Sequence, residues 1–307
     1  MNNKLLDLSP PVAAALNTGC PVVALESATI SHGLPYPRNV ETALAMEQII
    51  WQSGCVPATV AVLKGRLKAG LTAEEIEYLG KNGAQIAKAS RRDLPVLCAK
   101  GLDGATTVTT TMMIAHMAGI EVFATGGIGG VHRGIEISLD VSADLEELAR
   151  TPVMVVCSGV KAVLDLGMTL EYLETQGVPV LGYRTMELPA FYTRQSGFPL
   201  DYRMESAEEI AAAFRAQRDL GLQGGTLVCN PIPEEYSMNP RTAAAATEKA
   251  LAEAAEQHIR GNALTPFFLT RVQEHTGGES VACNIRLLLE NARLAAEVAF
   301  TLKSSGT

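Results

Sequence analysis

Closely spaced cysteines are absent from this sequence. Its six cysteines, at positions 20, 55, 98, 157, 229 and 283, lie more than thirty residues apart. This spacing excludes CxxC metal and redox motifs. Most of these cysteines close apolar stretches such as LPVLC, VMVVC and GTLVC. In such stretches we expect small, buried, reduced thiols of the kind found in cytosolic proteins.

Long uncharged apolar runs are also absent. No window reaches the roughly 18 uncharged apolar residues that a membrane-spanning helix needs. The first residues, MNNKLLDLSPPVAAALNTG, lack the basic start and long apolar core of a secretory signal. We therefore expect a cytoplasmic protein without a membrane span.

Basic runs are missing as well, and the net charge is −8. A partner that follows a nucleic-acid backbone needs a basic surface, so nucleic acid is disfavoured, and so is an anionic membrane. A local basic cluster can still hold one small anion. A phosphorylated metabolite is therefore compatible with the acidic composition.

Aromatic residues are scarce, at 5% of the chain. Apolar residues make up 47% and charged residues 19%, which is a globular composition and excludes disorder as the main state. Alanine, valine, isoleucine and leucine supply the core. This bias favours α/β packing over an aromatic-rich binding module.

Several common catalytic motifs are missing. The sequence contains no G-x-x-x-x-G-K-[ST], no G-x-S-x-G, no H-E-x-x-H and no EF-hand loop. The segment GGIGGVH fails the G-x-G-x-x-G pattern because His132 occupies the third glycine position, and it does not lead into a helix. A dinucleotide-binding fold is therefore disfavoured.

Apolar runs alternate with helical patterns between residues 21 and 230. The alternation predicts a three-layer α/β/α fold with a mostly parallel central sheet and a helical C-terminal third. No low-complexity linker divides the chain, so we expect one domain over residues 1–307. Residues 184–205 look irregular and hold several aromatics, which is typical of a small lobe, a lid or an oligomer contact. The expected strands span residues 21–26, 59–63, 121–125, 153–157, 178–183 and 225–230.

Helix boundaries are marked by capping residues. Thr72 with Glu75 three residues later forms a capping-box pattern. Asn39 is expected to cap a helix over residues 40–53. The Asn239-Pro240 pair predicts the start of a long helix that closes at Gly261.

Residues 121–161 are the stretch around which the chain is organised. Two strand-like runs, 121–125 and 153–157, flank a glycine-rich loop, the His132-Arg133 pair, Asp140 and a helix that starts near Ser142. In open α/β sheets, ligands bind at strand ends. A glycine loop, one carboxylate for a cation, a helix N-terminus for an anion and a lysine suit a phosphorylated small molecule.

Lys161 follows the second run through Ser158-Gly159-Val160. Burial at a strand end lowers the pKa of a lysine and leaves a neutral amine, which can form a Schiff base with a sugar aldehyde. The alternative is an ordinary lysine in the first turn of a helix.

Asp140 stands alone in ISLDVSAD. One carboxylate plus waters suits Mg²⁺ or Mn²⁺. A carboxylate before a helix also complements the helix dipole, and Asp144 fits that second role. Ser142 can cap the same helix or leave its N–H groups free for phosphate.

Glu26 closes the apolar run PVVAL. A carboxylate there should have a raised pKa, which suits a general acid, although an exposed residue that starts a loop is the alternative. His32 in TISHG can orient a ligand, but we expect it to cap a turn. Lys88, Arg91 and Arg92 form a basic patch that captures phosphate or remains solvated.

Ordered motifs across residues 8–300 resemble the pseudouridine-5′-phosphate glycosidase family. The segments that carry the resemblance are ALESATISHGLPYP, VPATVAV, KASRRDLP, FATGGIGGVHRG, DVSADLEEL, CSGVKAVLDLG, TLEYLETQGVPVLGY, CNPIP, TPFFLTRVQEHTGGES and NIRLLLENARLAAEVA.

The resemblance implies a lyase, also called pseudouridylate synthase, that reversibly cleaves pseudouridine 5′-phosphate to uracil and ribose 5-phosphate. It implies Lys161 as the covalent nucleophile, Glu26 as the proton donor and one Mn²⁺ per subunit on Asp140. It also implies a cytoplasmic homotrimer. The implied substrate contacts are Lys88, the Val108 backbone, Ser142, Ala143 and Asp144, with Thr125, His132 and Asn284 as further candidates.

The residues and the resemblance agree on the chemistry. A carbon–carbon glycosidic bond has no heteroatom leaving group, so the two-carboxylate hydrolysis used for ordinary glycosides does not suit it. An amine that captures the sugar as an iminium provides an electron sink. Two alternatives stay open: an aldolase-like lyase for another phosphosugar, and a non-catalytic sugar-phosphate binding protein.

Overall fold

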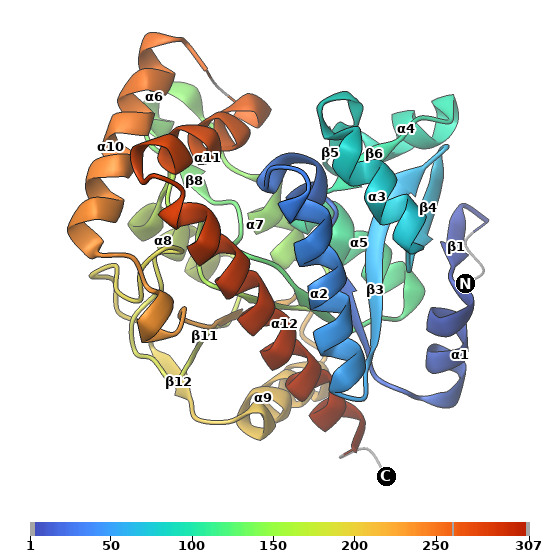
Figure 1. The fold of residues 1–307 in the computed structure, drawn as a ribbon. Coiled ribbons are helices and arrows are strands. Elements are labelled where there is room, and N and C mark those ends of the chain that lie inside the picture. Colours follow the sequence, from blue (N-terminus) through green and yellow to red (C-terminus); the bar gives the residue numbers. More distant parts are fainter. Residues whose placement is uncertain (1–3, 260, 305–307) are drawn as a thin grey trace.

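The fold is built on one large twisted sheet (Figure 1). The computed structural model describes residues 4–259 and 261–304. Within them lies an 11-stranded sheet. Its main order is β1 (Leu6–Leu8), β4 (Arg66–Ala69), β3 (Val56–Leu63), β2 (Val22–Leu25), β7 (Val122–Ala124), β9 (Met154–Cys157), β13 (Thr226–Cys229), β11 (Val180–Tyr183) and β12 (Tyr202–Met204).

The central strands pair in parallel, as the sequence predicts. Every pair along the path from β3 to β12 is parallel, whereas β4 and β6 (Gly104–Thr106) run antiparallel to β3. β5 (Ala87–Ala89) pairs in parallel with β6. Strands β2, β7, β9 and β13 are buried along their whole length, which explains their continuous apolar sequences.

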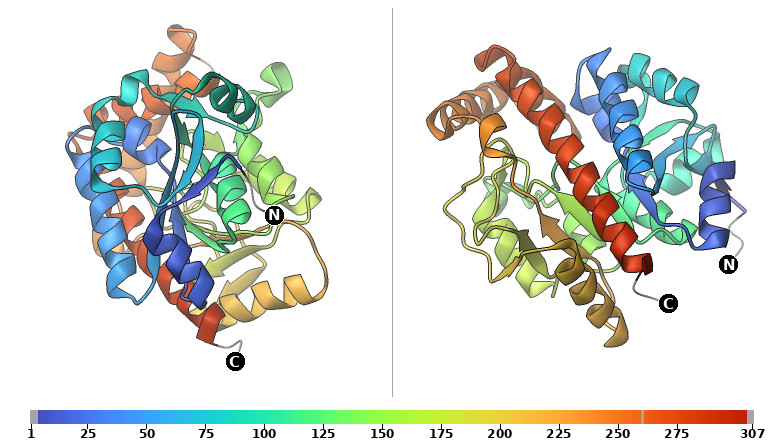
Figure 2. Two further views of the ribbon diagram at one scale, coloured as in Figure 1. Left: turned by 90° about the vertical axis from the view of Figure 1, so that its right-hand side faces the viewer. Right: turned by 60° about the horizontal axis from the view of Figure 1, so that its bottom comes forward.

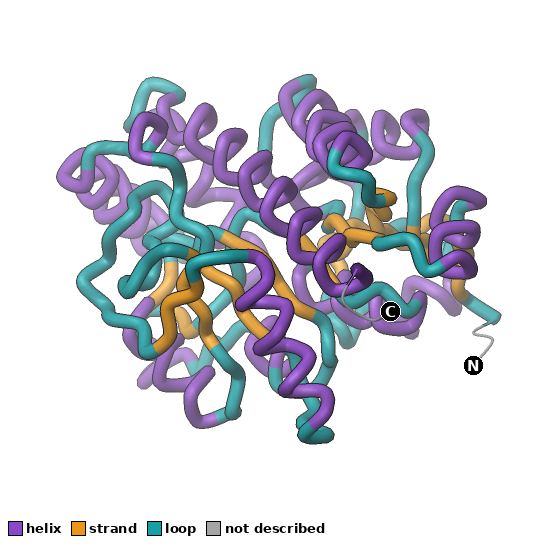
Figure 3. The backbone as a smooth tube through the Cα atoms, turned by 90° about the horizontal axis from the view of Figure 1, so that it is seen from below, coloured by secondary structure: helices purple, strands orange, loops and turns teal. Residues whose placement is uncertain are grey.

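Helices cover both faces of the sheet and complete the three layers (Figures 1 and 2). On one face lie α12 (Glu279–Ser304), α2 (Arg38–Gln52) and α9 (Ala207–Asp219); α12 packs against both of the other helices and against β2, β7 and β9. On the other face α5 (Val108–Ala118) packs against the strands and α7 (Ala143–Leu148). The view from below shows the strands running between the two helical layers (Figure 3).

The remaining helices lie at the periphery. The helical C-terminal third is confirmed by α10 (Pro240–Glu256), α11 (Leu264–His275) and α12. No helix within residues 4–259 and 261–304 is long and apolar enough to cross a membrane. The other α-helices are α1 (Pro10–Thr18), α3 (Ala73–Lys81), α4 (Leu94–Lys100), α6 (Ile135–Ser138) and α8 (Leu166–Thr175). Strands β8 (Val131–His132) and β10 (Leu164–Asp165) form an antiparallel pair outside the large sheet.

One expected helix cap is wrong. Helix α2 begins at Arg38, with Pro37 at the N-cap, so Asn39 lies inside the helix. Its buried amide donates to the Ile30 carbonyl (2.7 Å) and the Gly80 carbonyl (3.1 Å). Asn39 therefore satisfies two buried carbonyls of neighbouring segments, a tertiary role that local sequence does not reveal.

Two other expected helix boundaries can be compared with the structure, and one of them is confirmed. Helix α10 ends at Glu256 and not at Gly261, because His258 already adopts the left-handed backbone conformation (φ 55°) that breaks the helix. The capping box at Thr72 and Glu75 is confirmed, with both reciprocal hydrogen bonds present. Residues 104–106 form the short strand β6.

Candidate active site

Two adjoining cavities lie where the central strands end at their carboxyl edge. The larger has a volume of about 640 Å³ and the smaller about 50 Å³. Glu26, Lys88 and Lys161 line both. Because β2, β7 and β9 are adjacent and parallel, the segments that follow them start side by side, as expected for an α/β ligand site.

Glu26 follows β2 directly and is 5% exposed. The Thr125 hydroxyl, just after β7, donates a hydrogen bond to its Oε1. Burial raises the pKa of the Glu26 carboxyl, while nearby Lys161 and the Thr125 hydrogen bond oppose that rise. The environment therefore favours a protonated carboxyl, the state that a general acid requires.

Lys161 lies in a loop after β9 and not in a helix, so the alternative of a first-turn lysine is wrong. Its backbone N–H donates to the Ile128 carbonyl (3.1 Å), which ties this loop to the glycine-rich segment. Gly159 has φ 82°, and a Cβ there would collide with the Pro189 carbonyl. The glycine is thus required for the turn that brings Lys161 to both cavities.

Lys88 lies in the middle of β5 and lines both cavities. Burial and repulsion from Lys161 lower the pKa of Lys88 to about 8, while Asp144 and Glu26 oppose that decrease. Lys88 is therefore cationic at neutral pH but loses its proton more readily than an exposed lysine.

The segment 142–144 lines the larger cavity at the start of α7. The Ser142 side chain caps this helix by accepting from the Asp144 N–H (3.3 Å). The Asp144 carboxylate accepts hydrogen bonds from the Thr109 N–H (3.0 Å), the Thr109 hydroxyl (2.6 Å) and the Gly129 N–H (2.8 Å). Asp144 thus holds together α7, α5 and the glycine-rich loop, which fixes the cavity wall.

Asp140 lies on the wall of the larger cavity, with its side chain 35% exposed. Its Oδ2 is 3.9 Å from His132 Nδ1, and burial lowers the pKa of His132 despite the opposing effect of Asp140. Among the residues that the structure describes, no group of three His, Cys, Asp or Glu side chains converges as a metal cage. A single, partly exposed carboxylate beside open cavity space suits a hard cation that keeps much of its water, such as Mg²⁺ or Mn²⁺.

Val108 is fully buried as the first residue of α5 and lines neither cavity with its side chain. Its neighbours Thr107 and Thr109 do line the larger cavity. A role for Val108 is therefore confined to its backbone. Ala143 lies on the cavity wall between Ser142 and Asp144.

Neither phosphate capture nor a merely solvated turn, the two alternatives for the basic patch of Lys88, Arg91 and Arg92, describes Arg91. Its guanidinium makes a bidentate ion pair with the buried carboxylate of Glu147 on α7 (2.9 and 3.1 Å). Arg92 does line the larger cavity. The neighbouring residues of one sequence cluster thus have separate roles.

The smaller cavity has a more apolar wall, which includes Phe191, Pro266 and Leu269. Asn284 of α12 and His32 add polar groups to those of Glu26, Lys88 and Lys161. His32 was expected to cap a turn, but it lies on the cavity wall in a π-helical turn, η1 (Thr29–Gly33). A π-helical turn is often found at functional sites, yet the sequence gives no clear sign of it.

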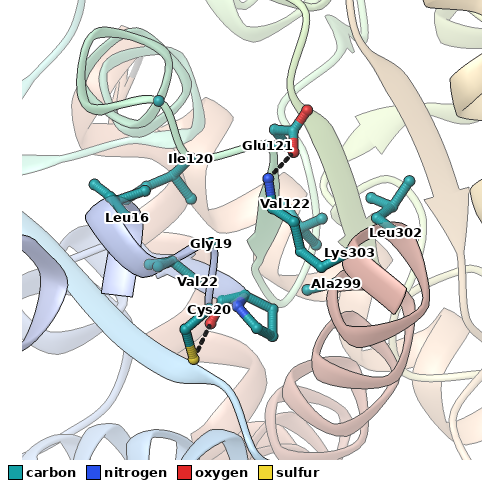
Figure 4. Close-up of a pocket in the computed structure, with 12 residues that line it drawn as sticks. Leu16, Gly19, Cys20, Val22, Ile120, Glu121, Val122, Ala299, Leu302 and Lys303 are labelled. Atoms are coloured by element: carbon teal, nitrogen blue, oxygen red, sulfur yellow. Dashed lines mark hydrogen bonds and ion pairs between the residues drawn. The ribbon is translucent and has the colours of Figure 1, made fainter. Parts of the chain in front are cut away.

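Another pocket, of about 100 Å³, lies at the opposite edge of the sheet (Figure 4). Leu16, Val22 and Val122 are among its walls, and Lys303 near the end of α12 pairs with Glu121 (2.9 Å). The pocket is remote from the strand ends that carry Glu26 and Lys161. Its ion pair joins the last helix to the start of β7, which is a structural role.

Comparison with known proteins places these residues in context. The chain matches the family described as "Indigoidine synthase A like protein" over residues 11–301. It is 57% identical to a pseudouridine-5′-phosphate glycosidase of Clostridium botulinum, with 98% of each chain covered. It is 55% identical to the enzyme of that name from Escherichia coli, with 96% of this chain and 95% of the relative covered.

Two solved structures share the fold. The prealnumycin C-glycosynthase AlnA, crystallised with ribulose 5-phosphate, is 40% identical with a TM-score of 0.90, and 98% of each chain is covered. An indigoidine synthase A-like protein from Thermotoga maritima is 35% identical with a TM-score of 0.89, and 97% of each chain is covered.

Proposed function

The chain belongs to the indigoidine synthase A-like family and, within it, to the pseudouridine-5′-phosphate glycosidases. We propose that it binds pseudouridine 5′-phosphate in the two cavities and cleaves it there. The reaction is a reversible lyase reaction that yields uracil and ribose 5-phosphate. Its substrate is a small phosphosugar derivative, in keeping with the ribulose 5-phosphate bound to AlnA.

The observation that carries the proposal is the shared wall of the two cavities. Glu26 and Lys161 lie where the cavities meet. The larger cavity contains Lys88 and the hydroxyl-bearing start of α7, which suit the phosphate end. The smaller, more apolar cavity suits the planar base. The bond between sugar and base then lies beside the amine and the acid.

Lys161 acts as the nucleophile in this scheme. Its amine forms a bond to C1′ of the ribose as the bond from C1′ to the ring oxygen breaks, and the proton that the amine gives up passes to that oxygen. The amine lone pair then forms a C=N bond as the bond between C1′ and C5 of uracil breaks. Water hydrolyses the resulting iminium, which releases ribose 5-phosphate and restores Lys161.

Glu26 acts as the proton donor. The departing uracil carbon must gain a proton as the C1′–C5 bond breaks, because a free carbanion would be too unstable. A protonated carboxyl at the junction of the cavities meets this need, and burial supplies the raised pKa. The buried Thr125 hydroxyl orients that carboxyl.

Glu26→Gln tests this role directly. The amide keeps the shape of the side chain but donates no proton to carbon. We expect the rate of uracil release to fall by about 10²–10⁴-fold. Uracil release by the wild type and by Glu26→Gln is measured spectrophotometrically. An unchanged rate would remove Glu26 as the acid.

We further propose that Asp140 holds one Mn²⁺ per subunit, although another divalent ion can serve. Support comes from its partly exposed carboxylate and from its place on the wall of the larger cavity, where water can complete the coordination of an ion. A cation there would supply charge that attracts the substrate phosphate. Mn²⁺ titration followed by paramagnetic resonance should show one bound ion per chain in the wild type and none in Asp140→Ala. Equal binding by both proteins would refute the assignment.

We also propose a homotrimer in the cytoplasm. Ile137 and Leu139 are 85% and 82% exposed on the segment that leads to Asp140, and such exposed apolar side chains support contact with another copy. The six free cysteines support a reducing compartment. Light scattering should give three times the 32.5 kDa chain mass. A monomeric mass would contradict the trimer.

Uracil release from pseudouridine 5′-phosphate, measured over a series of divalent ions, tests the proposed function as a whole. The wild type should produce uracil and ribose 5-phosphate in equal amounts. An aldolase-like lyase would leave this substrate intact, and a binding protein would retain it without turnover. Either outcome would overturn the proposal.

A further inference from the structure

Buried side-chain nitrogens without a hydrogen-bond partner are rare in this protein. Among the described residues they are His32 Nε2, Arg215 Nη1 and Arg286 Nε. Of these three residues only His32 lines one of the two active-site cavities. A buried polar atom without a partner is costly, and a cavity beside it indicates that a ligand supplies the partner.

The turn that carries His32 is held firmly. The Ser31 hydroxyl donates to the Leu79 carbonyl (3.1 Å), and the Asn39 amide donates to the Ile30 carbonyl (2.7 Å). Gly83 packs so closely on the Ser31 carbonyl that a Cβ there would collide with it. These contacts fix the backbone of the turn and so hold the position from which the imidazole enters the cavity wall, as a ligand-binding residue requires.

The protonation state of His32 determines whether its free ring nitrogen donates or accepts a hydrogen bond. Burial and repulsion from Lys88 lower the pKa of His32, and a hydrogen bond to the Ile86 backbone opposes that decrease. The ring is therefore neutral at neutral pH. Because Nε2 has no protein partner, it is Nδ1 that makes the hydrogen bond to the Ile86 backbone. The neutral ring then carries its proton on Nδ1, and Nε2 is an unprotonated acceptor.

We propose that His32 Nε2 accepts a hydrogen bond from a ring N–H of the pyrimidine base and so selects uracil. The inference rests on the proposed function, since it places the base in the smaller cavity. Uracil carries two ring N–H donors, each next to a carbonyl. Asn284 in the same cavity offers an amide that can both donate and accept. An acceptor and an amide together match an N–H/C=O edge.

Methylated bases provide the test, because methylation at N1 or N3 removes one donor. The synthesis reaction is run with ribose 5-phosphate and uracil, 1-methyluracil or 3-methyluracil. For the wild type, kcat/KM for one of the two methylated bases should be lower than kcat/KM for uracil by a factor of about ten or more. Selectivity is expressed as the ratio of kcat/KM for uracil to that for the disfavoured base.

His32→Phe and His32→Leu remove the acceptor, and His32→Gln retains one. In the first two variants the ratio should fall about tenfold because uracil loses efficiency, mainly through KM, while the methylated base changes little. His32→Gln should recover part of the ratio. His116→Leu changes an exposed histidine on α5 and should match the wild type. A general loss of packing would lower both bases equally, and that result would overturn the proposal.

A separate readout distinguishes this inference from the proposed function. Ribose 5-phosphate is trapped on the enzyme with borohydride in the absence of any base, and intact mass is measured. If the wild type forms no adduct, the proposed function fails. If the wild type and variants all form the adduct and the ratio is unchanged, only the role of His32 fails. If one acceptor-free variant forms no adduct, the ratio is taken from the other.

Discussion

At the scale of single residues, burial acts in opposite directions on the pKa values of two ionisable groups that share one cavity wall. It raises the pKa of Glu26 and lowers the pKa of Lys88 to about 8. In each case the buried environment disfavours the charged form of the side chain. The carboxyl therefore holds its proton to a higher pH than an exposed glutamate, and the lysine loses its proton at a lower pH than an exposed lysine.

Thr125→Val tests the link between Glu26 and its hydroxyl partner. The Thr125 hydrogen bond lowers the pKa of Glu26, so its removal should raise that pKa further. A general acid loses activity as pH rises through its pKa. The alkaline limb of the pH–rate profile should therefore move to higher pH. A limb that stays in place or moves to lower pH would contradict the role of this hydrogen bond.

Lys88 gives a pH dependence of binding. Its pKa is about 8, so its charge is present below that pH and is lost above it. If Lys88 holds the phosphate, KM should rise by about tenfold for each pH unit well above 8. Lys88→Arg keeps its charge and should show no such rise, whatever its absolute KM. Parallel KM profiles for the two proteins would exclude this role.

At the scale of elements, ion pairs and hydrogen bonds connect the segments that form the site. The Arg91–Glu147 pair joins the turn after β5 to α7, and thus connects the segments that carry Lys88 and Ser142. Asn291 of α12 is fully buried and donates to the Thr125 carbonyl (2.8 Å). The geometry of the site therefore depends on elements that are distant in the sequence.

Arg91→Met tests the contribution of the ion pair to stability. The Glu147 side chain is 1% exposed, so loss of its partner leaves a buried carboxylate unpaired. We expect the free energy of unfolding to fall by about 1–3 kcal/mol. Arg150→Met breaks the exposed Arg150–Glu146 pair on the same helix segment and should change it by less than about 0.5 kcal/mol. Urea unfolding of both variants measures the difference, and equal losses would contradict the special role of the buried pair.

The sequence predicts elements well where a local pattern determines them. β2, β7, β9 and β13 are continuous apolar runs because both of their faces are buried. The capping box at Thr72 is equally local. Asn39 and the π-helical turn are different, because each is determined by contacts with distant segments that no local pattern reveals.

At the scale of the whole molecule, the parallel sheet gathers the candidate site. The positions of Glu26 and Lys161 on the cavity wall follow from the sequence because each residue comes shortly after a buried strand, whereas Asp140 reaches the wall from the segment between α6 and α7. The contributions of Thr265 and Phe191 to the cavity wall cannot be predicted from the sequence, since only the tertiary fold brings these distant segments there. Arg91 shows the opposite case, because it belongs to the basic cluster of the sequence but forms an ion pair with Glu147.

The central claim is that the Lys161 amine bonds covalently to the first carbon of the sugar. The most direct test is borohydride trapping with ribose 5-phosphate, followed by peptide mass mapping, on the wild type and Lys161→Ala. The account predicts one reduced sugar-phosphate adduct on Lys161 in the wild type and none in the variant. An adduct on another lysine, or a wild-type protein that stays unmodified while it releases uracil, would contradict it.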